Sequence, residues 1–157
     1  MDGDIKNVFI SHVHEDDGGL ADLKQLIGKG GLTIRDSSIN SSNPNDAKHP
    51  DYIKSQILAP QIQWASTLLV YITPKTKNSE WVNWEIEYAE KQGKRIVGIY
   101  AHGANECDIP EALEKYADDV RRWNSDGVVE AILGETNEWH MPTGELRDPR
   151  PIKRYGC

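Results

Sequence analysis

The chain has 157 residues, of which 38% are hydrophobic and 27% charged, and its formal net charge is -7 at pH 7. Length and composition together predict one compact domain with a modest hydrophobic core. The acidic balance argues against a nucleic-acid binder, which would gather Lys and Arg against the phosphate backbone. No apolar run approaches the roughly 18 residues of a membrane span, and residues 1–4 lack the basic start of a signal peptide, so we expect a cytoplasmic protein with no membrane partner.

The first third of the chain predicts two strands, a helix between them and a long loop. The apolar run at 7–11 is typical of a buried strand. Aliphatic side chains recur at helical spacing over residues 20–27, and the glycine pair at 30–31 predicts the end of this helix through a left-handed cap. Residues 32–35 form a weaker strand candidate, and the polar residues 37–50 predict a long functional loop behind it.

The middle of the chain alternates helices and strands. A helix is predicted from about Pro50, and the next begins near Ser79, which is a favourable N-cap. Between and after them, residues 67–72 and 95–100 are apolar without alternation. Continuous apolarity of this kind indicates parallel strands that are covered on both faces.

The last predicted elements are two helices and one short strand. Pro110 is expected in the first turn of a helix, and Asp108 with Glu111 three residues later has the spacing of a capping box. Residues 120–123 form a brief strand candidate, and residues 125–134 predict a final helix that ends at a glycine.

The order of these elements predicts the fold class. Five strands that alternate with helices indicate an α/β domain of flavodoxin-like architecture, with a central five-stranded parallel sheet and helices on both faces. We expect this domain to span residues 1–134, and residues 135–157 to form an irregular tail packed on the same domain. Ligands of such folds bind at the carboxyl ends of the strands.

Glu85 is the most informative side chain for function. On a helix, Val82, Ile86 and Ala89 form the buried stripe, and Glu85 falls about 60° to one side of it, one turn after Trp81. The carboxylate is therefore expected to be partly desolvated and close to the strand ends, where such a group is costly unless it is paired or used. The alternative is a plain helix-start charge, worth about 0.3 to 1 kcal/mol.

The end of the first strand carries further candidates. Ser11 is positioned to donate a hydrogen bond to a ribose or phosphate, and His12 and His14 would share one side of an extended chain. Two imidazoles need a third ligand that no spacing indicates, so we predict solvated loop histidines and no metal site. Cys107 and Cys157 form no CxxC motif and indicate neither zinc nor a disulfide framework.

Two hypotheses, a phosphate-binding loop and a phosphotransfer receiver, are disfavoured. The glycine-rich residues 28–31 follow a helix, whereas a phosphate-binding loop follows a strand. The acidic residues 15–17 after the first strand suggest a phosphotransfer receiver, but residues 73–75 offer no aspartate to accept the phosphoryl group.

With these residues in view, the chain resembles bacterial TIR-like domains, in particular the ThsB-type group of the Thoeris anti-phage system. The resemblance covers about residues 6–134, and it is carried by three segments, at 8–12, 65–73 and 79–85. The last of these, which runs from Ser79 to Glu85, resembles the Trp-x-x-x-Glu element of the family.

The resemblance implies an enzyme that cleaves the bond between nicotinamide and ribose in NAD+, of the NAD+ glycohydrolase or ADP-ribosyl cyclase type. Glu85 is the implied catalytic residue, and NAD+ is the substrate, with no bound cofactor and no metal. A carboxylate at that place would stabilise the oxocarbenium-like ribose that forms when neutral nicotinamide leaves. The expected substrate-binding residues are Phe9, Ser11, His12, Asp36, Ser37 and Trp81.

The same resemblance implies the partners. The product, either ADP-ribose, a cyclic isomer or a conjugate, would be a signalling nucleotide that acts on a separate effector protein, and activity could require a homo-oligomer in which subunits complete each other's sites. The alternative hypothesis is a non-catalytic interaction and assembly module, because many TIR domains act as adaptors.

Overall fold

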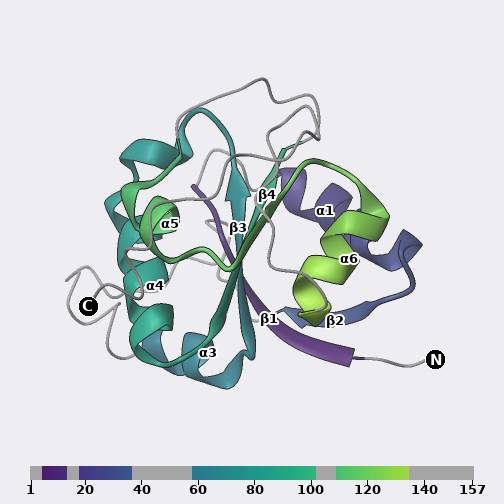
Figure 1. Cartoon of the computed structure of the whole chain (residues 1–157), viewed down its shortest axis with the longest axis horizontal. Coiled ribbons are helices and arrows are strands. Elements are labelled where there is room, and N and C mark those ends of the chain that lie inside the picture. The colour runs from purple at the N-terminus through teal and green to yellow at the C-terminus, as the bar shows by residue number, and fades with distance from the viewer. Residues whose placement is uncertain (1–4, 14–17, 37–57, 102–108, 135–157) are drawn as a thin grey trace.

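Five parallel strands form one sheet, and helices cover both of its faces (Figure 1). The computed structural model describes residues 5–13, 18–36, 58–101 and 109–134. The strand order is β2-β1-β3-β4-β5, which is the flavodoxin-like order and confirms the predicted fold class. The strands are β1 (Ile5–Ser11), β2 (Thr33–Asp36), β3 (Thr67–Ile72), β4 (Arg95–Tyr100) and β5 (Asp119–Arg121).

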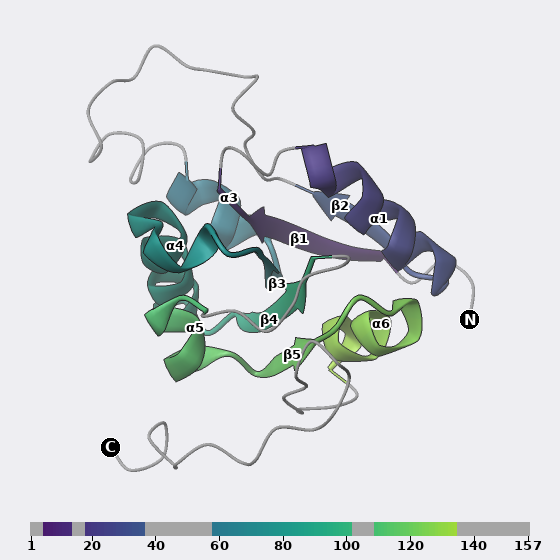
Figure 2. The ribbon, with the colours of Figure 1, turned by 90° about the horizontal axis from the view of Figure 1, so that it is seen from above.

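The helices are divided between the two faces of the sheet, as the view from above shows (Figure 2). One face carries α1 (Leu20–Lys29) and α6 (Ser125–Leu133). The other face carries α3 (Ala59–Trp64), α4 (Glu80–Lys91) and α5 (Glu111–Tyr116). No helix within the described residues is long and apolar enough to cross a membrane.

The strongest apolar runs predict the sheet most accurately. The strands predicted at 67–72 and 95–100 are confirmed to the residue, and the first begins two residues before the predicted start. The weaker candidates at 32–35 and 120–123 are confirmed with shifts of one or two residues at their ends. The predicted loop at 37–50, the predicted helix start at Pro50 and the tail at 135–157 lie outside the described residues.

The predicted left-handed cap of α1 is present, and Gly31 adopts it. Gly31 has a φ of 91°, a conformation that favours glycine. Its N–H donates to the Gly28 carbonyl over 3.0 Å, and the Leu32 N–H donates to the Ile27 carbonyl over 3.4 Å. This is the Schellman pattern, in which two late carbonyls of the helix gain partners. Leu32 and Ile27 are both buried in the same core cluster, so the chain enters β2 from a fixed point.

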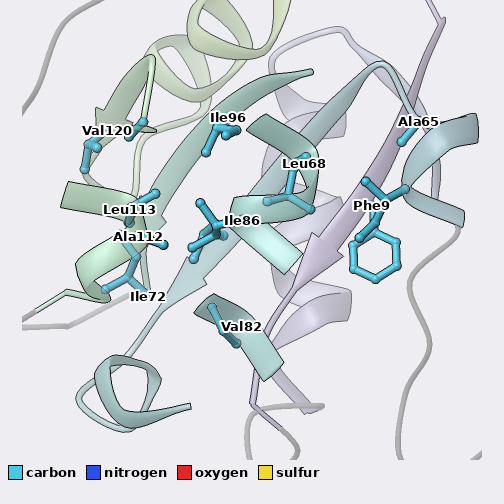
Figure 3. Close-up of a cluster of buried hydrophobic side chains, with 14 of the residues drawn as sticks. Phe9, Ala65, Leu68, Ile72, Val82, Ile86, Ile96, Ala112, Leu113 and Val120 are labelled. Carbon is cyan, nitrogen blue, oxygen red and sulfur yellow. The ribbon is translucent and has the colours of Figure 1, made fainter. Parts of the chain in front are cut away.

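Alternation along the strands separates two hydrophobic cores. Phe9, Leu68 and Ile96 belong to the core on the side of α3, α4 and α5, which also contains Val82 and Ile86 (Figure 3). Their neighbours along each strand, such as residues 8, 69 and 97, point toward α1 and α6. Burial of each such aliphatic or aromatic side chain contributes about 1.5 to 3 kcal/mol. Because strand side chains alternate, the side chain two residues after Phe9 also faces α4.

A hydroxyl-rich turn fixes where α4 begins. The Thr76 hydroxyl accepts from the Thr73 N–H over 2.9 Å and donates to the Tyr71 carbonyl over 3.2 Å. Ser79 is the N-cap, as predicted, and its hydroxyl accepts from the Val82 N–H over 3.1 Å. Thr76 thus anchors the turn to the end of β3, Ser79 caps α4, and the Ser79 N–H joins the two by donating to the Thr76 carbonyl over 3.1 Å.

Asn83 connects α4 to α5. Its Oδ1 accepts from the Ala112 N–H over 3.0 Å, and its Nδ2 donates to the Ser79 carbonyl over 3.0 Å. The prediction that Pro110 occupies the first turn is wrong: Pro110 is the N-cap, with an extended ψ of 142°, and it makes no side-chain cap. Asp108 of the predicted capping box lies outside the described residues. A neighbouring helix thus supplies the acceptor that the start of α5 needs.

We predict that Asn83→Ala lowers the free energy of unfolding by about 1 kcal/mol, because it removes an acceptor from the Ala112 N–H as an N-cap substitution does. Chemical denaturation measures the change. Glu87→Ala, an exposed substitution on the same helix, serves as control and should change stability by less than about 0.5 kcal/mol. Equal losses for the two variants would contradict the assigned role of Asn83.

Candidate functional site

A buried contact joins the end of β1 to the second turn of α4. Ser11 is the last residue of β1, and its hydroxyl donates a hydrogen bond of 2.6 Å to Oε1 of Glu85. The exposed fractions are 1% for Ser11 and 7% for Glu85. The Glu85 carboxyl is thus enclosed more fully than the helix periodicity alone predicts.

The pair lies where open α/β sheets bind ligands. Strand order reverses between β1 and β3, and Ser11 pairs with Val70 across this boundary. In folds of this class, ligands bind outside the carboxyl ends of the strands at such a reversal. Because Ser11 ends β1, Glu85 reaches this edge of the sheet from the α4 side.

Burial changes the protonation of Glu85. Desolvation raises the pKa of Glu85 from its ordinary value of 4.5 to about 8, and the hydrogen bond from Ser11 acts in the opposite direction. The carboxyl therefore carries a proton over most of the neutral range. A group that titrates near the working pH can either donate or accept a proton, which is the property of a general acid or base.

Two of the other predicted site residues, His12 and Trp81, lie close to this pair. His12 follows Ser11 and is half-buried, with Nδ1 3.1 Å from the Ile10 carbonyl oxygen. Trp81 precedes Glu85 by one turn of α4 and is 37% exposed. The structure thus leaves part of an indole ring on the surface near the buried carboxyl.

The remaining predicted substrate-binding residues are placed differently. Phe9 is 1% exposed and belongs to the core between the sheet and α3 and α4, so the structure does not bring its ring to the molecular surface (Figure 3). Asp36 ends β2, the strand beside β1, and it is in register with Val8, three residues before Ser11, so the two backbones are not level with each other. Ser37 lies outside the described residues.

The described ranges contain no group of three His, Cys, Asp or Glu side chains that could hold a metal ion. His14, Cys107 and Cys157 lie outside these ranges.

The contact between Ser11 and Glu85 was not predicted. The sequence indicated each residue separately, Ser11 for a ligand and Glu85 for catalysis. Their common face could have been found by combining two periodicities, because residues 9 and 11 share one face of a strand and Glu85 borders the buried stripe of the helix that covers it.

These features define a flavodoxin-like α/β domain with a buried glutamate at the strand-order reversal. The family model of the TIR-like domain of the Thoeris protein ThsB matches residues 9–106, which is more than half of the chain. The chain belongs to this family of TIR-like domains.

Other comparisons concern the fold alone. No curated protein is significantly similar to the chain. The solved structures that resemble it include the CMP N-glycosidase BcmB of Clostridium botulinum, with 19% identity and a TM-score of 0.42 over 63% of this chain and 75% of that chain. A conserved protein from Enterococcus faecalis V583 is 13% identical, with a TM-score of 0.44 over 63% of this chain and 65% of that chain. Likeness at this level carries no functional argument.

We predict that the stability difference between Glu85→Gln and the wild type depends on pH. The folded chain keeps the Glu85 proton up to a pKa of about 8, whereas the unfolded chain loses it near 4.5. Wild-type stability therefore falls as pH rises through this window, by up to about 1.4 kcal/mol per unit, and the amide variant lacks this loss.

Urea denaturation at several pH values measures this effect. The stability of Glu85→Gln relative to the wild type should rise steadily between about pH 5 and pH 8. Glu87→Gln, at an exposed position on the same helix, is the control and should follow the wild type. Parallel stability curves for wild type and Glu85→Gln would show that the native carboxyl is not protonated in this range.

Proposed function

We propose that the chain is an NAD+-cleaving enzyme of the glycohydrolase or ADP-ribosyl cyclase type, and that Glu85 is its catalytic residue. Its product would be an ADP-ribose-derived signalling nucleotide, cyclic or conjugated, that acts on a separate effector in anti-phage defence. The observation that supports this proposal is the buried Glu85 carboxyl, which Ser11 holds at the strand-order reversal of a ThsB-type TIR-like domain.

The chemistry suits a carboxylate in a dry place. When the bond between ribose C1′ and the nicotinamide nitrogen breaks, its electron pair neutralises the pyridinium ring, and positive charge develops on the ribose. An ionised Glu85 would stabilise that charge, and the low dielectric of a buried position strengthens the attraction. The nucleophile that then attacks C1′ loses a proton, which the same carboxylate can accept.

The raised pKa of Glu85 is compatible with this role. NAD+ carries a fixed positive charge on its nicotinamide ring, and an opposite charge within a few ångströms favours the ionised form of a carboxyl. Substrate binding would therefore help to ionise Glu85 at the time when its negative charge is needed. A neutral carboxyl in the empty site also avoids a buried, unpaired charge.

We predict that Glu85→Gln abolishes nicotinamide release from NAD+, with a loss of at least about a hundredfold, because the amide keeps the shape but cannot ionise. Wild type and variant are incubated with NAD+, both alone and with extract from phage-infected cells as a source of the trigger. Mass spectrometry then identifies the product and thereby the nucleophile. Equal nicotinamide release by both proteins would remove Glu85 from the mechanism.

We predict that Trp81→Ala raises KM for NAD+ several-fold, because the exposed indole lies one turn from Glu85 and can cover the ribose or a base by stacking. Trp64→Ala is a matched control, since Trp64 is 42% exposed but lies before β3, at the opposite end of the strands. Steady-state kinetics should show an effect for Trp81 alone. A similar change in both variants would assign Trp81 no specific contact.

A second candidate function is a non-catalytic assembly module. It is favoured by one observation: the Glu85 carboxyl already has a hydrogen-bond partner within the chain and is neutral over most of the neutral range, as a structural glutamate would be. If wild type releases no nicotinamide under any condition, including after exposure to infected-cell extract, the assembly function is the one that remains.

A further inference from the structure

The Ser11 hydroxyl is engaged before any ligand binds. It is 1% exposed and donates to Glu85 over 2.6 Å, although the sequence alone suggested that it would contact the substrate directly. Within the described part of the chain, this hydroxyl is the hydrogen-bond partner of the Glu85 carboxyl. A side chain in this place can influence the reaction without touching the substrate.

We propose that Ser11 is a positioning residue that holds the Glu85 carboxyl in one orientation and stabilises its ionised form. This inference rests on the proposed catalytic function of Glu85. It states that the Ser11 hydroxyl influences the pH at which Glu85 ionises.

The orientation argument begins with the rigidity of β1. This strand lies between β2 and β3, and Ser11 is in register with Val70. Glu85, in contrast, has a longer side chain with several rotatable bonds, which lose freedom when the carboxyl is fixed. A donor on a strand residue that is fixed by pairing with β3 can therefore select one rotamer of a side chain that reaches it from a helix.

The charge argument concerns which form of the carboxyl gains more from the bond. An ionised carboxylate accepts hydrogen bonds more strongly than a neutral carboxyl, so a hydroxyl that donates to it favours ionisation. Burial acts in the opposite direction and is the larger influence on the pKa of Glu85. Ser11 thus keeps the pKa of a buried group within reach of neutral pH.

Among the described residues, the elements packed against α4 carry few charges that could replace Ser11 in this role. His12 follows β1 beside Ser11, Lys6 lies near the beginning of β1, and α3 has no charged residue. Arg95 of β4 turns to the opposite face, where it contacts the Ala131 carbonyl and Asp119. The other titratable group on β4 is Tyr100, which is buried in the core. Those on α5 are Tyr116, which packs against the same core, and the charged residues Glu111, Glu114 and Lys115.

The first test measures the titration of Glu85 directly and needs no activity. In protein with isotope-labelled glutamate, the side-chain carboxyl carbon of Glu85 gives the NMR signal that Glu85→Gln lacks. We expect its midpoint near pH 8 in the wild type and higher by on the order of one unit in Ser11→Ala. Ser66→Ala is the control, because it removes a hydroxyl that donates to the Asn7 carbonyl of the same strand. An unchanged or lower midpoint in Ser11→Ala would overturn the inference.

A second variant guards against misfolding. Ser11→Cys nearly keeps the side-chain volume but offers only a weak donor, so it should also raise the midpoint. If Ser11→Ala unfolds, the result for Ser11→Cys decides, and an unchanged midpoint there overturns the inference.

The second test uses nicotinamide release. At about pH 7, Ser11→Ala should lower kcat roughly tenfold with little change in KM, and the deficit should shrink as rising pH ionises Glu85 without help. A higher KM with an unmoved pH profile would instead indicate a direct substrate contact and overturn the inference. If the NMR midpoint shifts but no variant or wild type releases nicotinamide, the proposed function fails while the role of Ser11 stands.

Discussion

One hydrogen bond between a strand and a helix, from Ser11 to Glu85, holds the buried carboxyl of this domain. A carboxyl that is 7% exposed is costly to ionise, and the Ser11 hydroxyl is the group that offsets part of that cost. The contact requires that β1 end at Ser11 and that α4 lie over β1 with Glu85 turned toward the sheet. The hydrophobic cores and the strand register therefore also fix the position of the Glu85 carboxyl.

The position of α4 is fixed from more than one side. Thr76 holds the preceding turn to the end of β3, Ser79 caps the helix and donates its N–H to the Thr76 carbonyl, and Val82 and Ile86 fix the rotation of α4 by their burial against the sheet. A rotation large enough to withdraw Glu85 from Ser11 would also expose that aliphatic stripe. Core packing and site geometry are thus one constraint, and the same interactions that stabilise the fold also orient the carboxyl.

Sequence reasoning was most accurate where one local property decides the outcome. Residues 67–72 and 95–100 are uninterrupted apolar runs, and such runs have few alternatives to a buried strand. Helix periodicity placed Glu85 at the edge of the buried stripe, but the extent of its burial depends on β1, which lies far away in the sequence. The link from Asn83 to Ala112 was missed for the same reason, since no local pattern indicates which neighbouring helix supplies a cap. The catalytic and substrate-binding roles stay predictions.

The Asn83 link also ties two helices to each other. Since Asn83 of α4 supplies the acceptor for the Ala112 N–H at the beginning of α5, a local opening of α4 would leave that N–H without this partner. The start of α5 therefore depends on a neighbour that lies earlier in the chain.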